Sequence, residues 1–319
     1  LMSWMGERVG AKVTIDEIDI PEGSGFSSET FLFDASWDGG GGSYVVRMGP
    51  AAADMAVFPS YDLSLQVGAM ALVREGSDVP VPNVLWHETG DEPLGSEFYV
   101  MEKLVGQSAP DNPPYPFGSW VTEATPQQLR RIQDHTADIM ARIHAIEIDD
   151  KARALLDRPD HGETPLSQHL NYERWYYDWA REGVDYPVIE EGFAWLEANR
   201  PTSDPVGINW GDSRIGNIMF HDFEPVAVVD GEMACLGAPE ADLAWQLMLH
   251  HFFLDILSVL EMPNPFPELF EIAPYVARYE ESSGRRVDLD ELAWYYAFGH
   301  LRFGIITIRT SLRAMAVGD

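Results

Sequence analysis

The sequence predicts an α+β protein in two parts, a small β-rich part with one helix at residues 1–104 and a larger, mainly helical part at 105–319. Three observations predict this division. Strand-like stretches that alternate apolar and polar residues are concentrated in the first part. A loop rich in proline follows residue 104. Longer stretches with helical spacing of apolar residues occupy the remainder, and strands followed by helices are typical of α+β proteins.

In the first part, strands are expected at residues 13–20, 29–35, 44–48 and 97–104. They are rich in β-branched and aromatic residues and are bounded by glycine, proline or serine. The glycine-rich stretch at 37–43 is expected to be a flexible hairpin loop. The spacing of apolar residues predicts the one helix of this part at 54–75.

The second part contains a clear helix start at Thr125. Thr125 and Gln128 have the spacing of a capping box, and Pro126 occupies the first helical position, where its missing N–H costs nothing. Further long helices are expected at 242–260 and 289–315. The first of these is apolar on most sides, so we expect it to be buried.

The charge balance excludes some classes of partner. The chain has 52 acidic and 21 basic side chains, for a net charge of −31. Nucleic acids and anionic membranes are not expected to bind, because phosphate neutralisation requires clustered Lys and Arg. Cationic ligands are attracted by such a field. A solvated acidic surface adapted to salt is the alternative explanation of the charge.

The single cysteine, Cys235, excludes an intrachain disulfide and fits a reducing compartment. No apolar run is long enough for a transmembrane helix, since His250, His251 and Asp255 interrupt the best stretch. The first residues lack the basic and apolar regions of a secretory signal. We therefore expect a cytoplasmic protein with no membrane partner.

The stretch from 208 to 232 carries a pattern with a chemical meaning. Asp212 and Asn217 have the spacing D-x-x-x-x-N, and Asp230 follows an apolar run. In kinases an aspartate orients the acceptor hydroxyl and takes its proton, while an asparagine and a second aspartate hold the metal ions that bridge the phosphates. The pattern predicts Asp212 as the base and Asn217 and Asp230 as Mg²⁺ ligands. A β-hairpin with Asp and Asn as turn residues is the alternative.

The whole string resembles the aminoglycoside phosphotransferase family, the small-molecule branch of the kinase-like fold. That family typically carries H-G-D-x-x-x-x-N, an apolar strand that ends in an acid, and G-x-P-x-x-D-L-A, which stands here at 237–244. The resemblance covers nearly the whole chain and is most specific from Ile208 to Trp245. It implies a bilobal protein-kinase-like fold that binds ATP with Mg²⁺ between its lobes.

The sequence departs from the family pattern at two positions. Trp210 stands where the family usually has His, and this is expected to cost a ring nitrogen that braces the loop. Gly231 stands where an aromatic residue usually follows the metal aspartate, and this is expected to loosen the backbone beside the metal. Neither departure removes a group that touches phosphate.

Two features near the N-terminus bear on the phosphates. The loop between the first two strands contains Gly23, Ser24, Ser27 and Ser28, and small residues let backbone N–H groups approach a triphosphate. The same residues also suit an ordinary hairpin turn. Arg47 ends the third strand, where kinases have a lysine that pairs with phosphates and many members of the resembled family have Arg. A surface arginine is the alternative.

The resemblance implies further roles. The strand at 97–104 would be the hinge, where the backbone from Glu102 to Leu104 meets the adenine edge and Met101 backs it. Asp242 would brace the catalytic loop by accepting backbone N–H bonds. His144, at the end of the helix that begins after Thr125, would be a structural core histidine.

We therefore expect an ATP-dependent kinase that moves the γ-phosphate to a hydroxyl of a small molecule. The acceptor is left open among an aminoglycoside, an amino alcohol, a sugar and a hydroxyacyl-CoA. The aromatic residues at 172–179 form either a packing face or a wall of the acceptor pocket. Glu232 either binds a second metal or braces the turn after Asp230.

Two alternatives belong to other classes. A metal-dependent hydrolase would gather Asp212, Asp230, Glu232 and His221 into one metal cluster, whereas the kinase interpretation leaves His221 in an exposed turn. A catalytically inactive, nucleotide-binding pseudokinase would bind ATP without turnover and would tolerate Asp212→Asn.

Overall fold

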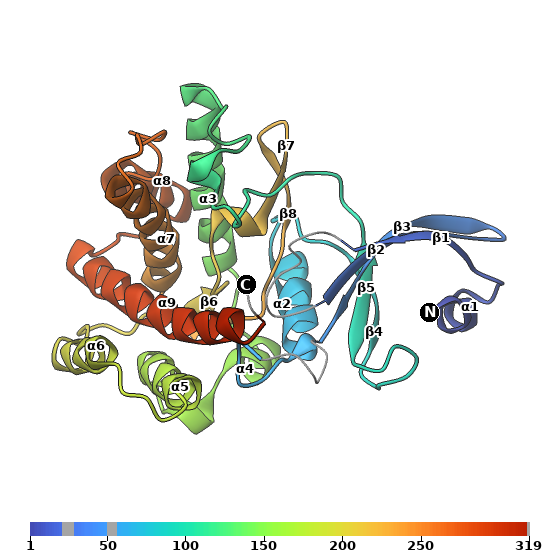
Figure 1. The fold of residues 1–319 in the computed structure, drawn as a ribbon, viewed down its shortest axis with the longest axis horizontal. Helices are drawn as coiled ribbons and strands as arrows, with labels where there is room; N and C mark the ends of the chain where they lie inside the picture. The colour runs from blue at the N-terminus through green and yellow to red at the C-terminus, as the bar shows by residue number, and fades with distance from the viewer. Residues whose placement is uncertain (21–28, 50–55, 318–319) are drawn as a thin grey trace.

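The computed structural model describes residues 1–20, 29–49 and 56–317. An antiparallel five-stranded sheet in the order β1-β2-β3-β5-β4 lies at one end of the molecule, and helices fill the other end (Figure 1). The strands are β1 (Thr14–Asp19), β2 (Glu29–Trp37), β3 (Gly40–Met48), β4 (Val84–Glu88) and β5 (Phe98–Glu102). This arrangement confirms the α+β class.

Each face of the sheet is covered by a helix. Successive side chains of a strand point to opposite faces, so neighbouring residues enter different clusters. Val46 of β3 packs in the cluster that includes Trp4 and Met5 of α1 (Met2–Val9). The adjacent Val45 packs in the cluster that includes Leu63 and Met70 of α2 (Leu63–Gly76). The helix α2 lies between the sheet and the helical part (Figure 1).

The glycine-rich stretch at 37–43 is not the flexible loop that the sequence suggested. Trp37 pairs with Gly40, so only two residues form the turn and the following glycines belong to β3. A Cβ at Gly41 would lie 2.7 Å from the carbonyl oxygen of Ala35. The glycines therefore permit close pairing with β2, because the ladder uses backbone groups and needs no side chains.

The helix expected at 54–75 begins later, at Leu63. Asp62 caps it, since its Oδ1 accepts a hydrogen bond from Leu65 N at 2.9 Å. The preceding residues form a loop in which the hydroxyl of Tyr61 accepts hydrogen bonds from the backbone N–H groups of Val57 and Phe58. Local capping therefore outweighed the apolar periodicity. Residues 54 and 55 lie outside the described part of the chain.

The helical part is built from long helices and short 3₁₀ turns. The capping box at the start of α3 is formed as predicted, with Gln128 N and Thr125 N both hydrogen-bonded. The helices are α3 (Pro126–His144), α4 (Asp150–Leu156), α5 (Pro165–Ala180), α6 (Pro187–Ala198), α7 (Pro239–Val259), α8 (Ile272–Ser283) and α9 (Leu289–Val317), and the turns are η1 (Tyr115–Phe117), η2 (Pro159–His161) and η3 (Ile215–Asn217).

Two small antiparallel sheets position the polar stretch around Asp212. In the first, β6 (Gly207–Asn209) pairs with β9 (Cys235–Gly237). In the second, β7 (Ile218–His221) pairs with β8 (Glu224–Val228). The loop from β6 to β7 and the segment from β8 to β9 therefore run between the same two sheets, which brings Asp212 and Asp230 to one region.

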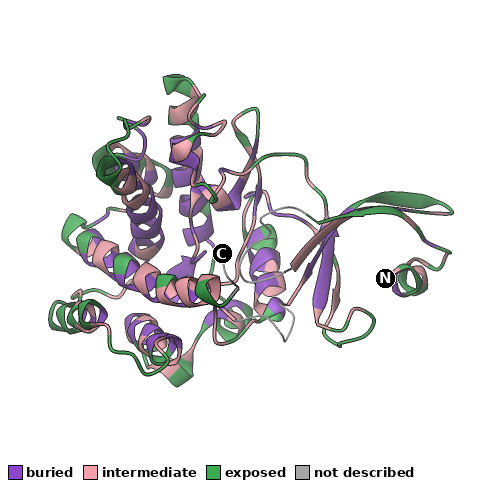
Figure 2. Ribbon diagram, in the orientation of Figure 1, coloured by how far each residue is buried: buried purple, intermediate pink, exposed green. Residues whose placement is uncertain are grey.

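The helix α7 lies in the core of the helical part, and most of its first three turns are buried (Figure 2). It packs against both α3 and α9, so it needs apolar residues on most sides. This confirms the buried helix expected from the sequence. Among the residues that the structure describes, no helix combines the length and the apolar character required to cross a membrane.

Candidate active site

One buried carboxylate holds the start of the 210–217 loop. Asp242, in the first turn of α7, accepts hydrogen bonds from the backbone N–H groups of Trp210 at 2.7 Å and Gly211 at 2.9 Å. His144 Nε2 donates to the same carboxylate at 3.0 Å. Burial would raise the pKa of Asp242, but the hydrogen bond and charge of His144 and the backbone donors lower it below its ordinary value. Asp242 braces the loop as the resemblance implied.

Gly211 allows the loop to pass close to the segment that follows Asp230. Its φ is +90°, which strains an L side chain, and a Cβ would lie 2.1 Å from the carbonyl oxygen of Met233. The carbonyl of Gly211 accepts a hydrogen bond from Arg302 Nη1 of α9 at 2.9 Å. The loop is therefore clamped between α7, α9 and residues 231–234.

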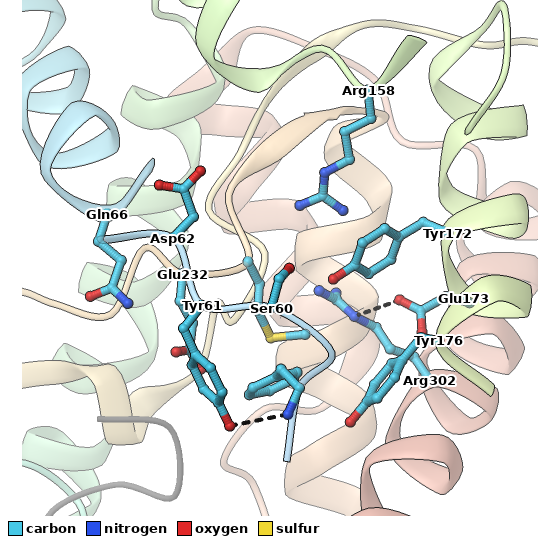
Figure 3. Close-up of a pocket in the computed structure, with 12 residues that line it drawn as sticks. Ser60, Tyr61, Asp62, Gln66, Arg158, Tyr172, Glu173, Tyr176, Glu232 and Arg302 are labelled. Atoms are coloured by element: carbon cyan, nitrogen blue, oxygen red, sulfur yellow. Dashed lines mark hydrogen bonds and ion pairs between the residues drawn. The ribbon is translucent and has the colours of Figure 1, made fainter. Parts of the chain in front are cut away.

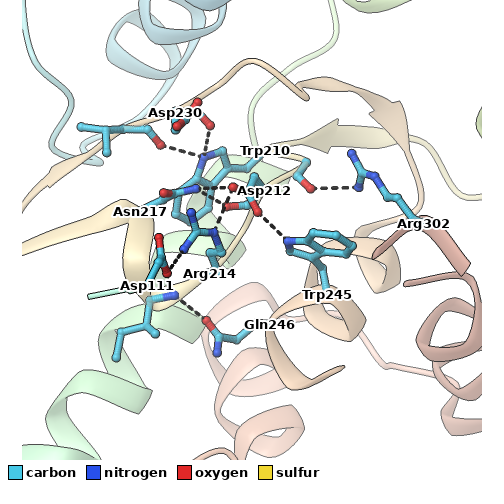
Figure 4. Close-up of polar contacts among 12 residues, drawn as sticks. Asp111, Trp210, Asp212, Arg214, Asn217, Asp230, Trp245, Gln246 and Arg302 are labelled. Atoms are coloured by element: carbon cyan, nitrogen blue, oxygen red, sulfur yellow. Dashed lines mark hydrogen bonds and ion pairs between the residues drawn. The ribbon is translucent and has the colours of Figure 1, made fainter. Parts of the chain in front are cut away.

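The carboxylate of Asp212 is mostly buried, with 13% of the side chain exposed, and is held on both oxygens (Figure 4). Oδ1 accepts a hydrogen bond from Trp245 Nε1 at 2.7 Å. Oδ2 accepts from Asn217 Nδ2 at 2.7 Å and from Arg214 Nε at 3.0 Å. Burial would raise the pKa of Asp212, but the charge of Arg214 and these hydrogen bonds lower it below its ordinary value. Asp212 is therefore ionised at neutral pH, and Oδ1 keeps a lone pair for another donor.

Asn217 lies beside Asp212 and is oriented by it. Its Nδ2 also donates to the backbone carbonyl of Asp212 at 2.9 Å. Because the amide nitrogen is bound on this side, the amide oxygen Oδ1 faces elsewhere and remains able to bind a cation. The backbone carbonyl of Asn217 accepts from Val229 N at 3.0 Å, which ties Asn217 to the residue before Asp230.

Asp230 follows β8 in a backbone conformation that is uncommon for a residue other than glycine, with φ of 64°. Its Oδ1 is buried and has no hydrogen-bond partner within the described ranges. Its Oδ2 lies 3.8 Å from Nη1 of Arg47, whose strand β3 comes from the sheet. Burial would lower the pKa of Arg47, but the charges of Asp230, Tyr99 and Glu232 raise it.

The structure corrects the expectation for Trp210. The indole Nε1 donates to the backbone carbonyls of Val229 at 3.1 Å and Asp230 at 3.2 Å. The nitrogen of the larger ring therefore braces the segment that carries Asp230, so the substitution of His by Trp loses no ring donor. The spacing of residues along the chain could not reveal where the indole would reach.

Trp210→Phe is expected to lower the free energy of unfolding by about 1–3 kcal/mol, because it leaves carbonyls of the Asp230 segment without their donor. Urea unfolding would measure the loss. Trp210→His restores a ring N–H and should recover part of the stability. Trp195→Phe is the matched control, since Trp195 on α6 is half exposed. Equal stability of the Trp210→Phe and Trp195→Phe variants would contradict the bracing role.

Gly231 lies close to α2. A Cβ at this position would lie 3.2 Å from the Cβ of Ala69, which is a tight contact. A larger side chain at this position would therefore crowd α2. The close approach of that helix accounts for a glycine next to Asp230.

The predicted nucleotide residues fall into two groups. Met101 is buried in β5, and Glu102 ends that strand with its N–H donated to the Asn83 carbonyl at 3.1 Å. The backbone N–H of Lys103 donates to the carbonyl of Ser43. Leu104 is therefore the first residue after those whose N–H groups are bonded to the sheet or its flanking loop. Four predicted phosphate-loop residues lie outside the described part of the chain, namely Gly23, Ser24, Ser27 and Ser28.

The oxygens around Asp230 fit a hard cation. Mg²⁺ prefers oxygen ligands and is usually held by one or two carboxylates together with substrate phosphates. The buried, unpartnered Oδ1 of Asp230 and the amide oxygen of Asn217 provide such ligands. In contrast, no group of three or more His, Cys, Asp and Glu side chains within the described ranges is arranged to hold a metal. His221 is exposed at the end of β7, so the hydrolase cluster is not formed.

A small hollow, open to solvent, lies beside this site (Figure 3). It meets the site through Glu232 and Met233, which follow Asp230, and through Arg302, which contacts Gly211. The buried Glu173 of α5 lies 3.3 Å from Arg302, and its Oε2 has no hydrogen-bond partner in the part of the chain described. The hollow therefore adjoins the 210–217 loop on the side of α5 and α9.

The aromatic segment at 172–179 contributes side chains both to the hollow and to the core. Tyr172 and Tyr176 line the hollow. Tyr177 is fully buried and packs against Phe193 of α6, with ring centroids 6.0 Å apart. One face of α5 therefore forms a wall of the hollow, and an adjacent face of the same helix packs into the core.

Two side chains of the site were not singled out from the sequence. Arg214 lies inside the D-x-x-x-x-N spacing and links Asp212 to Asp111, with which it forms an ion pair. Trp245 follows the D-L-A segment and donates to Asp212. The position of Arg214 two residues after Asp212 was an available signal, whereas Trp245 reaches the loop only because α7 packs beneath it.

Comparison with known proteins identifies the family. Residues 20–287 match the model of the phosphotransferase enzyme family. The chain is 26% identical over 298 residues to the probable acyl-CoA dehydrogenase IBR3 of Arabidopsis thaliana, which covers 88% of this chain and 34% of that protein. It is 29% identical over 248 residues to acyl-CoA dehydrogenase family member 11 of Gallus gallus, covering 76% of this chain and 29% of the relative. The chain thus spans about a third of the length of these relatives.

Two solved structures with the same fold are named as phosphotransferases. Macrolide 2′-phosphotransferase MphH of Brachybacterium faecium superposes with a TM-score of 0.62 at 18% identity, covering 100% of this chain and 94% of that one. The GDP complex of aminoglycoside 2′-phosphotransferase-IIIa gives a TM-score of 0.61 at 15% identity, covering 99% and 91%. At these identities the likeness shows the protein-kinase-like fold. The family match over most of the sequence and the geometry around Asp212 lead to one conclusion: this chain belongs to the phosphotransferase enzyme family.

Proposed function

We propose that the chain catalyses ATP-dependent transfer of the γ-phosphate to a hydroxyl of a small molecule. One observation carries the proposal. An ionised, mostly buried aspartate, Asp212, lies against Asn217, while Asp230 presents a buried oxygen without a partner in the described residues. A base beside two oxygen ligands is the set that phosphoryl transfer uses.

The metal would be held by Asn217 and Asp230 through the side-chain oxygens described above. When bound, Mg²⁺ neutralises the charge of the phosphates and orients them. Arg47 lies next to Asp230 and carries the positive charge that suits a phosphate oxygen. Gly23, Ser24, Ser27 and Ser28 are proposed to cover the phosphates through their backbone N–H groups, as small residues do in kinase-like enzymes.

Asp212 is proposed to accept the hydrogen bond of the acceptor hydroxyl through Oδ1 and to take its proton. Its lowered pKa makes it a weak base, which suffices because a loose transition state transfers the proton late. Trp245 and Asn217 hold the carboxylate in one orientation, so binding aligns the hydroxyl without further rearrangement.

The adenine is proposed to contact the backbone after β5. Glu102 N–H and Lys103 N–H are used within the protein, which leaves the backbone of Leu104 for the adenine edge. Met101, buried at the end of β5, would lie behind the base.

The hollow beside Glu232 and Arg302 is proposed as the acceptor site. Two of the solved neighbours in fold are named for macrolides and aminoglycosides and another is named an ethanolamine kinase, whereas relatives in sequence are named acyl-CoA dehydrogenases. A pooled panel should therefore contain aminoglycosides, amino alcohols, sugars and hydroxyacyl-CoA thioesters, with mass spectrometry to detect a product that gains one phosphate.

Asp230→Asn is the variant that tests the metal role. It should lower kcat/KM for phosphoryl transfer by more than about a hundredfold and raise the Mg²⁺ concentration required for ATP binding, because it removes the charged ligand. Asp222→Asn is the control, since this side chain in the β7–β8 turn is 93% exposed. Wild-type protein that binds Mg-ATP but phosphorylates no panel member and does not hydrolyse ATP would indicate a pseudokinase. Absence of ATP binding would overturn the proposal altogether.

A further inference from the structure

The hollow beside the 210–217 loop contains an arginine that forms no ion pair with a carboxylate in the described residues. Arg158 immediately precedes η2 and is half-buried in the wall of the hollow. Its Nη2 donates to the carbonyl of Ala234 at 3.3 Å, and its guanidinium lies over the Tyr172 ring, 4.3 Å from the centroid. Figure 3 shows the guanidinium pointing toward the other side chains of the hollow. Its position is thus set by a carbonyl and an aromatic ring.

The other arginines near the site are paired. Arg302 lies 3.3 Å from Glu173, Arg214 lies 3.0 Å from Asp212, and Arg47 lies 3.8 Å from Asp230. Within the described ranges, Arg158 forms no ion pair. Among these arginines, Arg158 is thus the one without an ion pair in the described residues, although carboxylates greatly outnumber cations in the chain. A guanidinium keeps several N–H donors in a planar fork that suits carboxylate and phosphate oxygens.

The carboxylates that line the hollow are engaged by other groups. Glu173 is paired with Arg302. Asp62 caps α2 and accepts from Leu65 N at 2.9 Å, at the helix end where backbone dipoles favour a negative charge. Glu232 contributes to the charge environment of Arg47 on the side of the proposed metal site. The charge of Arg158 also acts on Glu173, but none of these carboxylates forms an ion pair with Arg158 in the described residues, so its remaining N–H donors are left for a ligand.

We propose that the phosphate acceptor carries an anionic group, a carboxylate or a phosphate, which Arg158 binds in the hollow. This rests on the proposed function, because the same molecule must present its hydroxyl to Asp212. The ring of Tyr172 holds the guanidinium from one side, so its N–H fork faces the space that the ligand enters. Arg158 thereby sets the class of acceptor: hydroxy acids or phosphorylated alcohols are bound in preference to amino alcohols.

Two matched series of ligands test the proposal with the intact chain. The first contains straight-chain hydroxy acids of increasing length, their neutral hydroxy amides and the corresponding amino alcohols. The second contains diol monophosphates of the same lengths. Binding is measured by calorimetry with Mg²⁺ and a non-hydrolysable ATP analogue, and phosphoryl transfer is measured separately. One anionic series should bind about tenfold or more tightly than its neutral analogue, as a charge-assisted hydrogen bond to arginine provides. The series that binds distinguishes carboxylate from phosphate.

Arg158→Gln should weaken binding of the anionic ligand about ten- to hundredfold and leave the affinity for the neutral amide within about twofold. Arg158→Lys keeps the charge without the planar fork and should give an intermediate loss. Arg153→Gln is the matched control, since Arg153 is exposed on the neighbouring α4 and also forms no ion pair in the described chain. It should leave all affinities unchanged.

Each outcome separates this proposal from the proposed function. Binding of both the acids and the diol monophosphates no tighter than that of the amides, tighter binding of amino alcohols, or an Arg158→Gln variant that binds the anion like wild type would overturn the role of Arg158. Anion binding that depends on Arg158, combined with no phosphoryl transfer from ATP to any ligand, would support the anion site and overturn the kinase activity.

Discussion

Asp212→Asn is expected to lower kcat for phosphoryl transfer about a thousandfold, within the range that a positioned general base contributes. The amide has nearly the shape of the carboxylate, so Trp245 can still donate to its oxygen. It has no negative charge and cannot take the proton of the acceptor hydroxyl. The KM for ATP should change only a few-fold, because Asp212 is proposed to contact the acceptor and not the nucleotide. Steady-state kinetics with the acceptor found in the panel would measure both constants.

Asp222→Asn provides the control for this experiment, since Asp222 is exposed in the β7–β8 turn and its replacement should leave kcat unchanged. Far-UV and near-UV circular dichroism would establish that the Asp212→Asn variant is folded. Transfer at a rate within about tenfold of wild type would show that Asp212 is not the base. Loss of ATP binding together with transfer would instead indicate that Asp212 supports the nucleotide site.

Asp242→Ala is expected to be the most destabilising single change considered, at about 3–5 kcal/mol, because it removes one member of a buried charged network. The N–H groups of Trp210 and Gly211 and the ring of His144 would all lose their acceptor. Asp242→Asn retains the shape and one acceptor oxygen, so it should fold with a smaller loss. Urea unfolding followed by circular dichroism would measure both variants.

The loss should depend on pH in a defined direction. The folded-state pKa of Asp242 is lowered, so its ionised form stabilises the protein above the unfolded-state value, near the ordinary 3.8, and this contribution is lost as the pH falls through the folded-state pKa. The stability gap between wild type and Asp242→Asn should therefore be full at neutral pH and narrow below about pH 4. Asp255→Ala, at an exposed position of α7, should change stability by no more than about 0.5 kcal/mol. A gap that is independent of pH would contradict the charged role of Asp242.

Local patterns predicted local structure well in this chain. The capping box at Thr125 formed as expected, since its hydrogen bonds join residues three positions apart. The apolar stretch after Pro239 became a buried helix. Local patterns failed where pairing or capping outweighed composition, as in the glycines of β3 and in the start of α2 at Asp62. In both cases backbone hydrogen bonds decided which residues form the strand or the helix. The spacing of apolar residues carries no information about these hydrogen bonds.

The sequence by itself determined the fold class and the chemical types gathered around Asp212, Asn217 and Asp230, because short spacings and apolar periodicity encode them. Only the tertiary structure decided that the Trp210 indole braces the Asp230 segment, that Trp245 holds Asp212, and that Arg158 faces the hollow without a carboxylate partner in the described chain. Each of these facts depends on side chains that meet from distant segments. Such meetings follow from how α5, α7 and α9 pack around the 210–217 loop, which no local pattern specifies.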